Sequence, residues 1–315
     1  MKQTIFLLED GRLRRLAFEA RGPARWASWH PRGDSALLAG DRGSLTRFSG
    51  GEFRQVSSGT DRNLRCVAFH PDGARAYACG NSGALLRIED DRVTPIEFDR
   101  SATLRRLAWN STGERALAVG NGGVAFVMDR SERPTTALGA ETHLRSVAWH
   151  PTRDTAIVTG NCFRDSIGGL TPSPNLFKLQ GDLLAEISDL EASRDDLTCA
   201  SWHPSGSDCL ISGFDQTWHT AALVSYSEAG VARLEWGEER LFPTSCSWEP
   251  SGSFALIGTT PLTGDEGTAA LYQFDRKERS VTKIADLEGR GASCIAWRGE
   301  TALIACSSTT RAYSA

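Results

Sequence analysis

The sequence predicts an all-β protein, a seven-bladed β-propeller of four-stranded antiparallel blades. Two observations lead to this fold class. First, segments such as WASWHPRGDSALLAG and CVAFHPDGARAYACG align with one another along their length, so the chain contains an internal repeat. Second, seven such units occupy the 315 residues. That leaves about 45 residues per unit, the length of four short strands with their turns.

Each unit has one aromatic anchor near the end of its predicted first strand. The anchors are Trp29, Phe69, Trp109, Trp149, Trp202, Trp248 and Trp297. The residue immediately before the anchor is always Ala or Ser, and the residue two before it is always apolar. Alternation with a period of two, together with one face restricted to small side chains, predicts a tightly packed strand.

The remaining strands of a unit follow from its turn residues. After the anchor comes a turn of the type His-Pro-x-Gly, and then Ala-x-x-x-Gly, as in residues 36–40 and 76–80. This pattern predicts a hairpin into a second strand. The run LTRF, GGE and FRQV over residues 45–56 predicts a third and a fourth strand joined by a polar turn.

Two segments carry a family resemblance. LRCVAFHPDGARAYACG (64–80) and LRSVAWHP (144–151) are similar to the blade pattern V-x-S-V-A-F-S-P-D-G-x-x-L-A-S-G of the tryptophan-aspartate (WD) repeat propellers. The resemblance covers essentially the whole chain. It departs from the family in lacking the Gly-His and Trp-Asp dipeptides, and the second unit ends in IED where Trp-Asp would stand.

The ring is expected to close through both ends of the chain, which makes residues 1–315 a single domain. Leu16 lies 13 residues before its anchor, like Val56 and Ile96 before theirs, so residues 12–18 predict the fourth strand of the last blade. Either 4–9 or 309–314 can supply its third strand. We favour 4–9 because TIFLLE has more apolar area to bury. Such closure removes two exposed sheet edges.

Composition and motifs exclude several classes of function. The formal charge of −4 argues against a nucleic-acid partner. No apolar run approaches the roughly 18 residues that a membrane span needs, and the N-terminus lacks a secretory pattern, so we expect a cytoplasmic protein. Phosphate-loop, dinucleotide-binding, nucleophile-elbow and zinc-protease motifs are absent. No catalytic residue is therefore assigned.

Histidines and cysteines are assigned structural roles. His30, His70, His150 and His203 share one repeat position, the turn after the first strand, and residues equivalent by repeat do not converge on one metal ion. Cysteines recur at positions of the first and second strands, as in Cys66, Cys199 and Cys294, and are expected to be reduced and buried. We predict no metal site and no cofactor.

Four arginines are candidate binding residues. Arg25, Arg65, Arg105 and Arg145 stand four residues before the anchors of four consecutive units, where the other three units have Thr or Ser. Loops of a propeller alternate between its faces, so these arginines should form an arc on one face, the top. Guanidinium groups make paired hydrogen bonds to carboxylates. The alternative is that they pair with acids of the chain itself, such as Asp61 or Glu141.

The second candidate feature is a set of long top-face loops. Extra residues follow the second strand of the fourth, fifth and sixth units, over 162–175, 214–222 and 259–270. Trp218 and His219 lie in one of these loops and have no place in the repeat pattern. Long loops on a rigid scaffold commonly carry binding groups. The alternative is that Trp218 only packs its own loop.

These features predict a non-catalytic platform that binds a partner protein or an acidic peptide on its top face. We expect a monomeric propeller within a larger complex. The alternative is a propeller-type lactonase or hydrolase with a metal at the channel mouth. Asp61, Glu141, Asp195 and Asp196 are the acids near the first strands, and their alternation with arginines disfavours a hard cation there.

Overall fold

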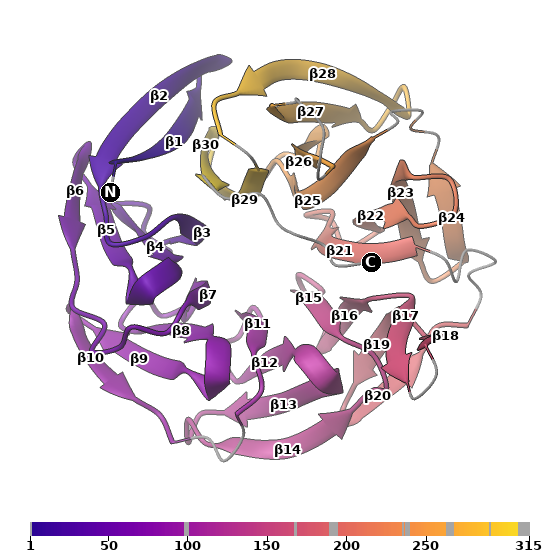
Figure 1. The fold of residues 1–315 in the computed structure, drawn as a ribbon, viewed down its shortest axis with the longest axis horizontal. Helices are drawn as coiled ribbons and strands as arrows, with labels where there is room; N and C mark the ends of the chain where they lie inside the picture. Colours follow the sequence, from indigo (N-terminus) through magenta and orange to yellow (C-terminus); the bar gives the residue numbers. More distant parts are fainter. Residues whose placement is uncertain are drawn as a thin grey trace.

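A computed structural model describes residues 2–97, 101–166, 169–188, 195–234, 236, 240–262, 268–289 and 291–307. Seven four-stranded antiparallel blades form a closed ring (Figure 1), which confirms the predicted fold class. The first strand of each blade lies nearest the centre of the ring. Within the described residues, no helix is long and apolar enough to span a membrane.

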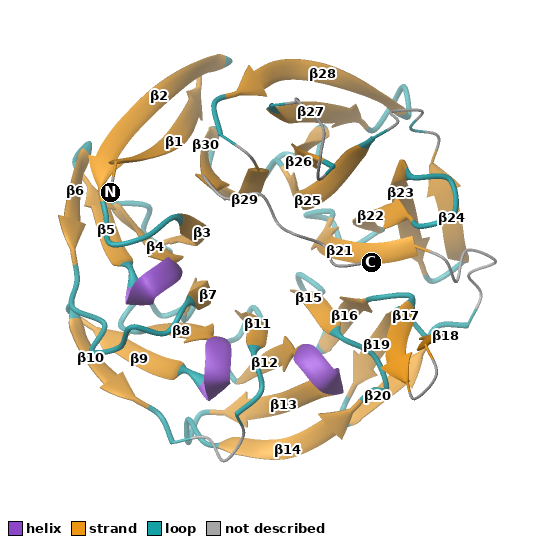
Figure 2. Ribbon diagram, in the orientation of Figure 1, coloured by secondary structure: helices purple, strands orange, loops and turns teal. Residues whose placement is uncertain are grey.

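Blades 1 to 3 follow the 40-residue repeat closely. Blade 1 contains β3 (Ala24–Trp29), β4 (Ser35–Gly40), β5 (Leu45–Ser49) and β6 (Glu52–Gln55). Blade 2 contains β7 (Leu64–Phe69), β8 (Ala76–Gly80), β9 (Leu85–Glu89) and β10 (Arg92–Pro95). Blade 3 contains β11 (Leu104–Trp109), β12 (Arg115–Gly120), β13 (Val124–Asp129) and β14 (Pro134–Gly139). Short 3-10 turns, η1 (Asp41–Gly43), η2 (Asn81–Gly83) and η3 (Asn121–Gly123), follow their second strands (Figure 2).

Blades 4 to 6 carry the additional residues. Blade 4 contains β15 (Leu144–Trp149), β16 (Thr155–Gly160), β19 (Leu176–Gln180) and β20 (Leu183–Glu186), with an added hairpin of β17 (Phe163–Ser166) and β18 (Gly169–Pro172). Blade 5 contains β21 (Asp195–Trp202), β22 (Cys209–Asp215), β23 (Thr220–Ser227) and β24 (Gly230–Leu234). Blade 6 contains β25 (Leu241–Trp248), β26 (Phe254–Pro261), β27 (Ala269–Asp275) and β28 (Ser280–Leu287).

Blade 7 is assembled from both ends of the chain. Its strand order is β2 (Arg12–Glu19), β1 (Lys2–Glu9), β30 (Thr301–Ser307) and β29 (Gly291–Arg298). β1 pairs antiparallel with β30, and Ile5 lies opposite Ala305. The segment favoured from the sequence therefore supplies the third strand, because its apolar side chains are buried: Ile5 is 0 % exposed and Leu7 is 3 % exposed. The alternative, 309–314, lies outside the described residues.

The small residue before each anchor makes room for the next blade. The Trp149 indole of blade 4 donates a hydrogen bond to the carbonyl oxygen of Ala108 in blade 3, at 2.9 Å, and Ala108 packs against the core that contains Trp149. Trp202 and Trp29 make the same bond to Ala148 and Ala296 of the preceding blades. A larger side chain before the anchor would displace the neighbouring indole.

The four repeat histidines join consecutive blades on the bottom face. Nε2 of each lies 2.8–3.1 Å from a glycine carbonyl oxygen in the turn of the next blade: His30 to Gly73, His70 to Gly113, His150 to Gly206 and His203 to Gly252. Nδ1 accepts a backbone N–H of its own turn, as in the 3.1 Å bond from Arg32 to His30. The structural role predicted for these histidines is confirmed.

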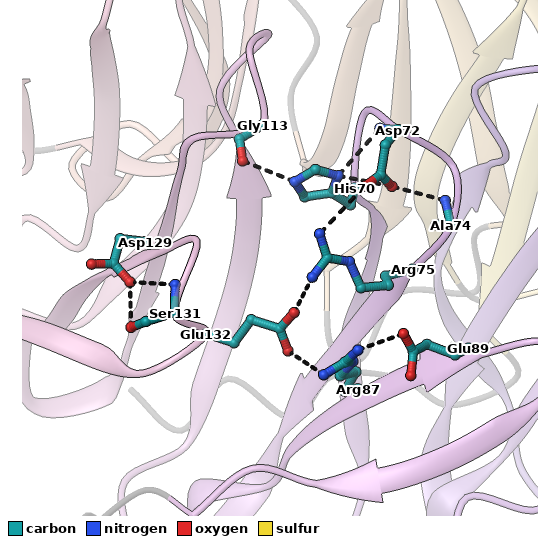
Figure 3. A network of polar contacts seen from close by, with 10 residues as sticks. All are labelled: His70, Asp72, Ala74, Arg75, Arg87, Glu89, Gly113, Asp129, Ser131 and Glu132. Carbon is teal, nitrogen blue, oxygen red and sulfur yellow. Dashed lines mark hydrogen bonds and ion pairs between the residues drawn. The ribbon is translucent and has the colours of Figure 1, made fainter.

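Ion pairs reinforce the same joints farther from the axis. Glu132, in the turn between β13 and β14, pairs with Arg75 and Arg87 of blade 2 (Figure 3). Asp91 of blade 2 pairs with Arg47 of blade 1 in the same way, at 2.8 Å. In blades 2 and 3 the turn between third and fourth strands thus anchors an acid on basic side chains of the preceding blade.

Deleting residues 1–18 should cause aggregation or a large fall in melting temperature, because it would expose the edge of β30 and the apolar side chains that Ile5 covers. Size-exclusion chromatography and thermal unfolding measure both effects. A milder change, Ile5→Ala, should cost about 2–5 kcal/mol of unfolding free energy. The control is Leu183→Ala, at a side chain that is 67 % exposed. A deletion variant that stays monomeric with unchanged melting would show that β1 does not close the ring.

Ala108→Leu should cost on the order of 1–3 kcal/mol in denaturant unfolding, since the added atoms would collide with the Trp149 indole. Ala185→Leu is the matched control, because Ala185 is exposed on the outermost strand of blade 4. Equal stability of the two variants would contradict the packing of anchors on small residues.

Acidification should weaken the fold through His150. Burial is the largest cause that lowers the pKa of His150 below 6.5, and its Nδ1 accepts the backbone N–H groups of Thr152 and Arg153. The unfolded imidazole therefore binds protons more readily than the folded one. This contribution is fully present above pH 6.5 and is lost as pH falls through the lower folded pKa. Urea unfolding at several pH values should show it, and His150→Asn should flatten the dependence.

Asparagine is a suitable replacement because Asn110 occupies the same position in blade 3. Its Oδ1 accepts backbone N–H groups of the turn, and its Nδ2 donates to Asp154 of blade 4 at 3.1 Å. A pH dependence that is unaltered in the variant would assign the acid sensitivity to other groups.

Candidate functional site on the top face

Each innermost strand contains a β-bulge, and the candidate arginines occupy it. The register between first and second strands shifts at the same repeat position in all seven blades, as between Leu64 and Cys66 or between Leu104 and Arg106. The residues within these shifts are Arg25, Arg65, Arg105, Arg145, Thr198, Thr244 and Ser293. A bulge redirects a side chain away from the regular pleat. The sequence-predicted arc of arginines is thus a feature of the ring's inner rim.

The arginines of the arc are each held by the residue that follows the second strand of the same blade. Arg65 Nε donates to Asn81 Oδ1 and Arg105 Nε donates to Asn121 Oδ1, both at 2.8 Å. Arg145 makes the same bond to Asn161. In blades 2 to 4 this partner is a neutral amide, which orients the guanidinium without opposing its charge.

Arg25 differs because its partner is a carboxylate. Its Nε and Nη2 donate to the two oxygens of Asp41, at 2.9 and 2.5 Å. The Arg25 and Asp41 side chains are only 11 % and 13 % exposed. Of the two acids considered as intramolecular partners, Asp61 pairs with Arg21 at 2.9 Å. For Arg25, the intramolecular pairing considered as the alternative is thus made with Asp41.

A close backbone approach places these asparagines. Asn81 N–H donates to the carbonyl oxygen of Asn63, which precedes β7, at 2.9 Å. The approach requires Gly80, because a Cβ atom there would lie 2.1 Å from that oxygen. The glycine that ends the second strand therefore sets the position of the amide that holds Arg65.

The other three blades use the bulge for blade-to-blade contacts. Thr198 Oγ1 donates to the carbonyl oxygen of Pro243 in blade 6 at 2.8 Å, and Thr244 Oγ1 donates to that of Ala292 in blade 7 at 2.5 Å. Their first strands have eight residues, against six in blades 1 to 4. The bulge position is accordingly uneven around the ring, with guanidinium groups in blades 1 to 4 and hydroxyl groups in blades 5 to 7.

The long top-face loops are partly regular structure. In blade 4 the extra residues form the β17–β18 hairpin, and in blades 5 and 6 many of them lengthen the second strand and its partner. The sequence predicts loops here because short strands without a core-facing pattern leave little periodic signal. Residues 167–168 and 263–267 of the predicted loops lie outside the described residues.

Trp218 is presented to solvent by a well-held turn, the tryptophan turn of residues 215–220. Its side chain is 76 % exposed. Asp215 Oδ1 accepts the backbone N–H groups of Thr217 and Trp218, at 2.8 and 3.0 Å. Arg233 Nη2 in turn donates to Asp215 Oδ2 at 3.0 Å. The alternative in which Trp218 packs down its own loop is therefore wrong.

His219 links the tryptophan turn to blade 6. It adopts a left-handed conformation with φ of 55°, and its carbonyl oxygen accepts the Arg240 N–H at 3.2 Å. Its ring lies edge-on to Phe214, with centroids 6.0 Å apart, and Phe214 packs on Phe242 of blade 6. His219 thus fixes the turn while remaining exposed.

Carboxylates on this face are engaged by the chain itself. Arg233 Nη1 pairs with Asp195 Oδ2 at 2.7 Å, and Asp196 accepts hydrogen bonds from Cys162 and Gln216. Burial raises the pKa of Asp195, and the Arg233 ion pair opposes the rise. In the described ranges, no three histidine, cysteine or acidic side chains gather in a way that could hold a metal ion.

The central channel holds a pair that sequence reasoning missed. The guanidinium carbon of Arg106 lies 3.6 Å from the centre of the Trp26 ring, so a cation–π contact joins blade 3 to blade 1. Such contacts contribute on the order of 2 kcal/mol when desolvated. Trp26 also packs against the cores of blades 5 and 6 across the channel. The sequence signal for this pair is the position three residues before each anchor. That position holds Trp26 and Arg106 in two units and only Cys or Ser in the other five.

The bottom face has a shallow depression of about 670 Å³ between blades 3 and 4. Its charged residues neutralise one another: Arg115 pairs with Asp154 at 2.6 Å, and Arg130 pairs with Glu114. It therefore offers a ligand no uncompensated charge of either sign from these pairs.

Comparison with known proteins identifies the fold only. No protein-family model and no curated protein sequence matches the chain. Among solved structures, the WD40 repeats of RRP9 align over 96 % of this chain and 97 % of that one, with a TM-score of 0.68 and 10 % identity. Kuenenia stuttgartiensis hydrazine synthase aligns over 89 % and 90 %, with a TM-score of 0.66 and 15 % identity. The chain is thus similar in fold to a WD40 propeller and to part of an enzyme structure.

Proposed function

We propose that the protein is a non-catalytic interaction platform that binds a partner protein or peptide on its top face. The observation that carries the proposal is the exposure of Trp218 on a rigid turn. An indole that is 76 % exposed contributes little to the fold, yet four hydrogen bonds and an ion pair around Asp215 and His219 hold its backbone in place. An aromatic side chain on an ordered backbone loses less entropy on binding than one on a mobile loop, which suits the centre of an interface.

The arginine arc supports an acidic partner. Arg65, Arg105 and Arg145 are each oriented by a neutral amide, and their guanidinium groups lie at the inner rim of the same face. The first half of the chain, residues 1–157, holds 23 basic and 18 acidic side chains. This excess of positive charge favours the approach of an anionic surface to blades 1 to 4. Trp218 would then supply apolar contact at blade 5.

The thiols support an intracellular, reducing compartment, which we propose to be the cytoplasm. All eight cysteines lie in the described residues and are free and buried. Burial raises the pKa of Cys294 to about 12, so this thiol is protonated at neutral pH, and it donates to the Ala27 carbonyl oxygen of the neighbouring blade. Thiols in such roles persist where disulfides are reduced.

Site-specific photocrosslinking tests the platform. Photoreactive p-benzoylphenylalanine in place of Trp218 should yield a discrete crosslinked species in extracts of the native cells. The same group in place of Leu183 is the control, because Leu183 is similarly exposed but lies at the bottom end of blade 4. With the partner purified, Trp218→Ala should weaken binding by tenfold or more, on the order of 2 kcal/mol, with unchanged melting.

Charge reversal tests the acidic side of the partner. Arg65→Glu combined with Arg105→Glu should abolish binding, with a modest loss of stability because both arginines hold their asparagine turns. Arg92→Glu, exposed on the bottom face, should leave binding intact. Crosslinking from position 183 alone, or binding lost only in the Arg92 variant, would place the interface on the opposite face and refute the proposal.

A further inference from the structure

Arg106 is a buried cation without a counter-charge among the described residues. The residue is only 9 % exposed. Its Nη1 donates to the backbone carbonyl oxygens of Arg65 and Arg105, at 3.4 and 3.1 Å. In the described part of the chain, no side chain accepts a hydrogen bond from its Nε. Removing a charge from water is costly unless an opposite charge or a full set of hydrogen bonds replaces the solvent.

The surroundings of Arg106 leave one nitrogen of the guanidinium group, Nη2, for a ligand. Trp26 covers one face of the group at 3.6 Å, and Nη1 faces the two carbonyl oxygens. Nε is sealed from solvent and has no acceptor among the described residues. Nη2 has no acceptor there either and can donate a charge-assisted hydrogen bond to a carboxylate oxygen. The carbonyl oxygens that hold Nη1 belong to the bulge residues Arg65 and Arg105, so the guanidinium group lies near the top-face end of the first strands.

The lining of the channel is compatible with a small anion. The residues equivalent to Arg106 in the other blades are Trp26, Cys66, Ser146, Cys199, Ser245 and Cys294. Five of these six are small, and none is acidic. Cys66 and Cys294 direct their thiols to carbonyl oxygens of the next blade, Leu107 and Ala27, at 3.5 Å. An anion that reaches Arg106 therefore meets no repelling carboxylate from this ring.

We propose that Arg106 is the buried end of a carboxylate-binding site that opens on the top face. The Nη2 group of Arg106 binds a carboxylate oxygen, Trp26 holds the guanidinium plane, and Arg65 and Arg105 flank the entrance. This inference rests on the proposed function, since an acidic residue of the partner is one source of the carboxylate. A free dicarboxylate is the other source, and the experiment separates the two.

The test is nuclear magnetic resonance of the arginine Nε–H groups in the full chain. Three probes are added in turn: a hexaglutamate peptide, glutarate and inorganic phosphate, with hexaglutamine as the uncharged control. Hexaglutamate should shift the resonance that disappears in Arg106→Gln. Its dissociation constant should rise at least tenfold in Arg106→Gln and in Arg106→Lys, which keeps the charge and loses the planar guanidinium group. Arg92→Gln should bind as the wild type does.

Each outcome decides the proposal. Shifts with hexaglutamate alone assign the site to a peptide carboxylate, and equal shifts with glutarate assign it to a small dicarboxylate; both support the site. Shifts with phosphate but not with either carboxylate, no shift with any probe, or binding that persists in both Arg106 variants would overturn it. Crosslinking from position 218 does not depend on Arg106. A negative result at Arg106 therefore refutes the carboxylate site and leaves the proposed interaction platform to its own test.

Discussion

The antiparallel pairing of β1 with β30 is the contact on which the remaining architecture depends. A propeller blade buries both faces against its neighbours, so an open ring would leave two blades with one uncovered face. Ile5 and Leu7 of the N-terminal strand complete the seventh blade and let it contact blade 1, where Cys294 bonds to Ala27. Once the ring is closed, the number of blades fixes the diameter of the channel and the distance between first strands.

Closure explains why so many conspicuous residues have structural roles. A histidine on one blade can reach the glycine carbonyl of the next only if all blades share one spacing and tilt, and His30, His70, His150 and His203 all make that contact. The same holds for indoles stacked on small residues and for acids placed on basic side chains of the preceding blade. A residue that repeats in the sequence therefore marks a repeated contact between blades. This distinguishes the side chains that the ring requires from those that are available for binding.

The proposed binding groups lie where the chain departs from the repeat. The bulge column holds Arg in four blades and Thr or Ser in three, which divides the top face into a guanidinium arc and a sector of blade-to-blade hydrogen bonds. The position three residues before each anchor lines the channel and holds small residues except Trp26 and Arg106. These two side chains, from blades 1 and 3, contact each other. Trp218 has no equivalent position in the repeat pattern. All three departures meet on one face, although each arises from a different element.

The sequence by itself determined the blades, the closure of the ring through both chain ends and the turn role of the histidines, because local periodicity and turn residues set these features. It favoured residues 4–9 over 309–314 as the third strand of the last blade, and the pairing of β1 with β30 decided that choice. It also placed the arginines on one face through the alternation of loops. Only the tertiary structure decided that Arg25 is neutralised by Asp41, that Trp218 is exposed, and that Arg106 meets Trp26. Those outcomes depend on side chains brought together by closing the ring, and contacts between residues distant in sequence leave no periodic signal along the chain.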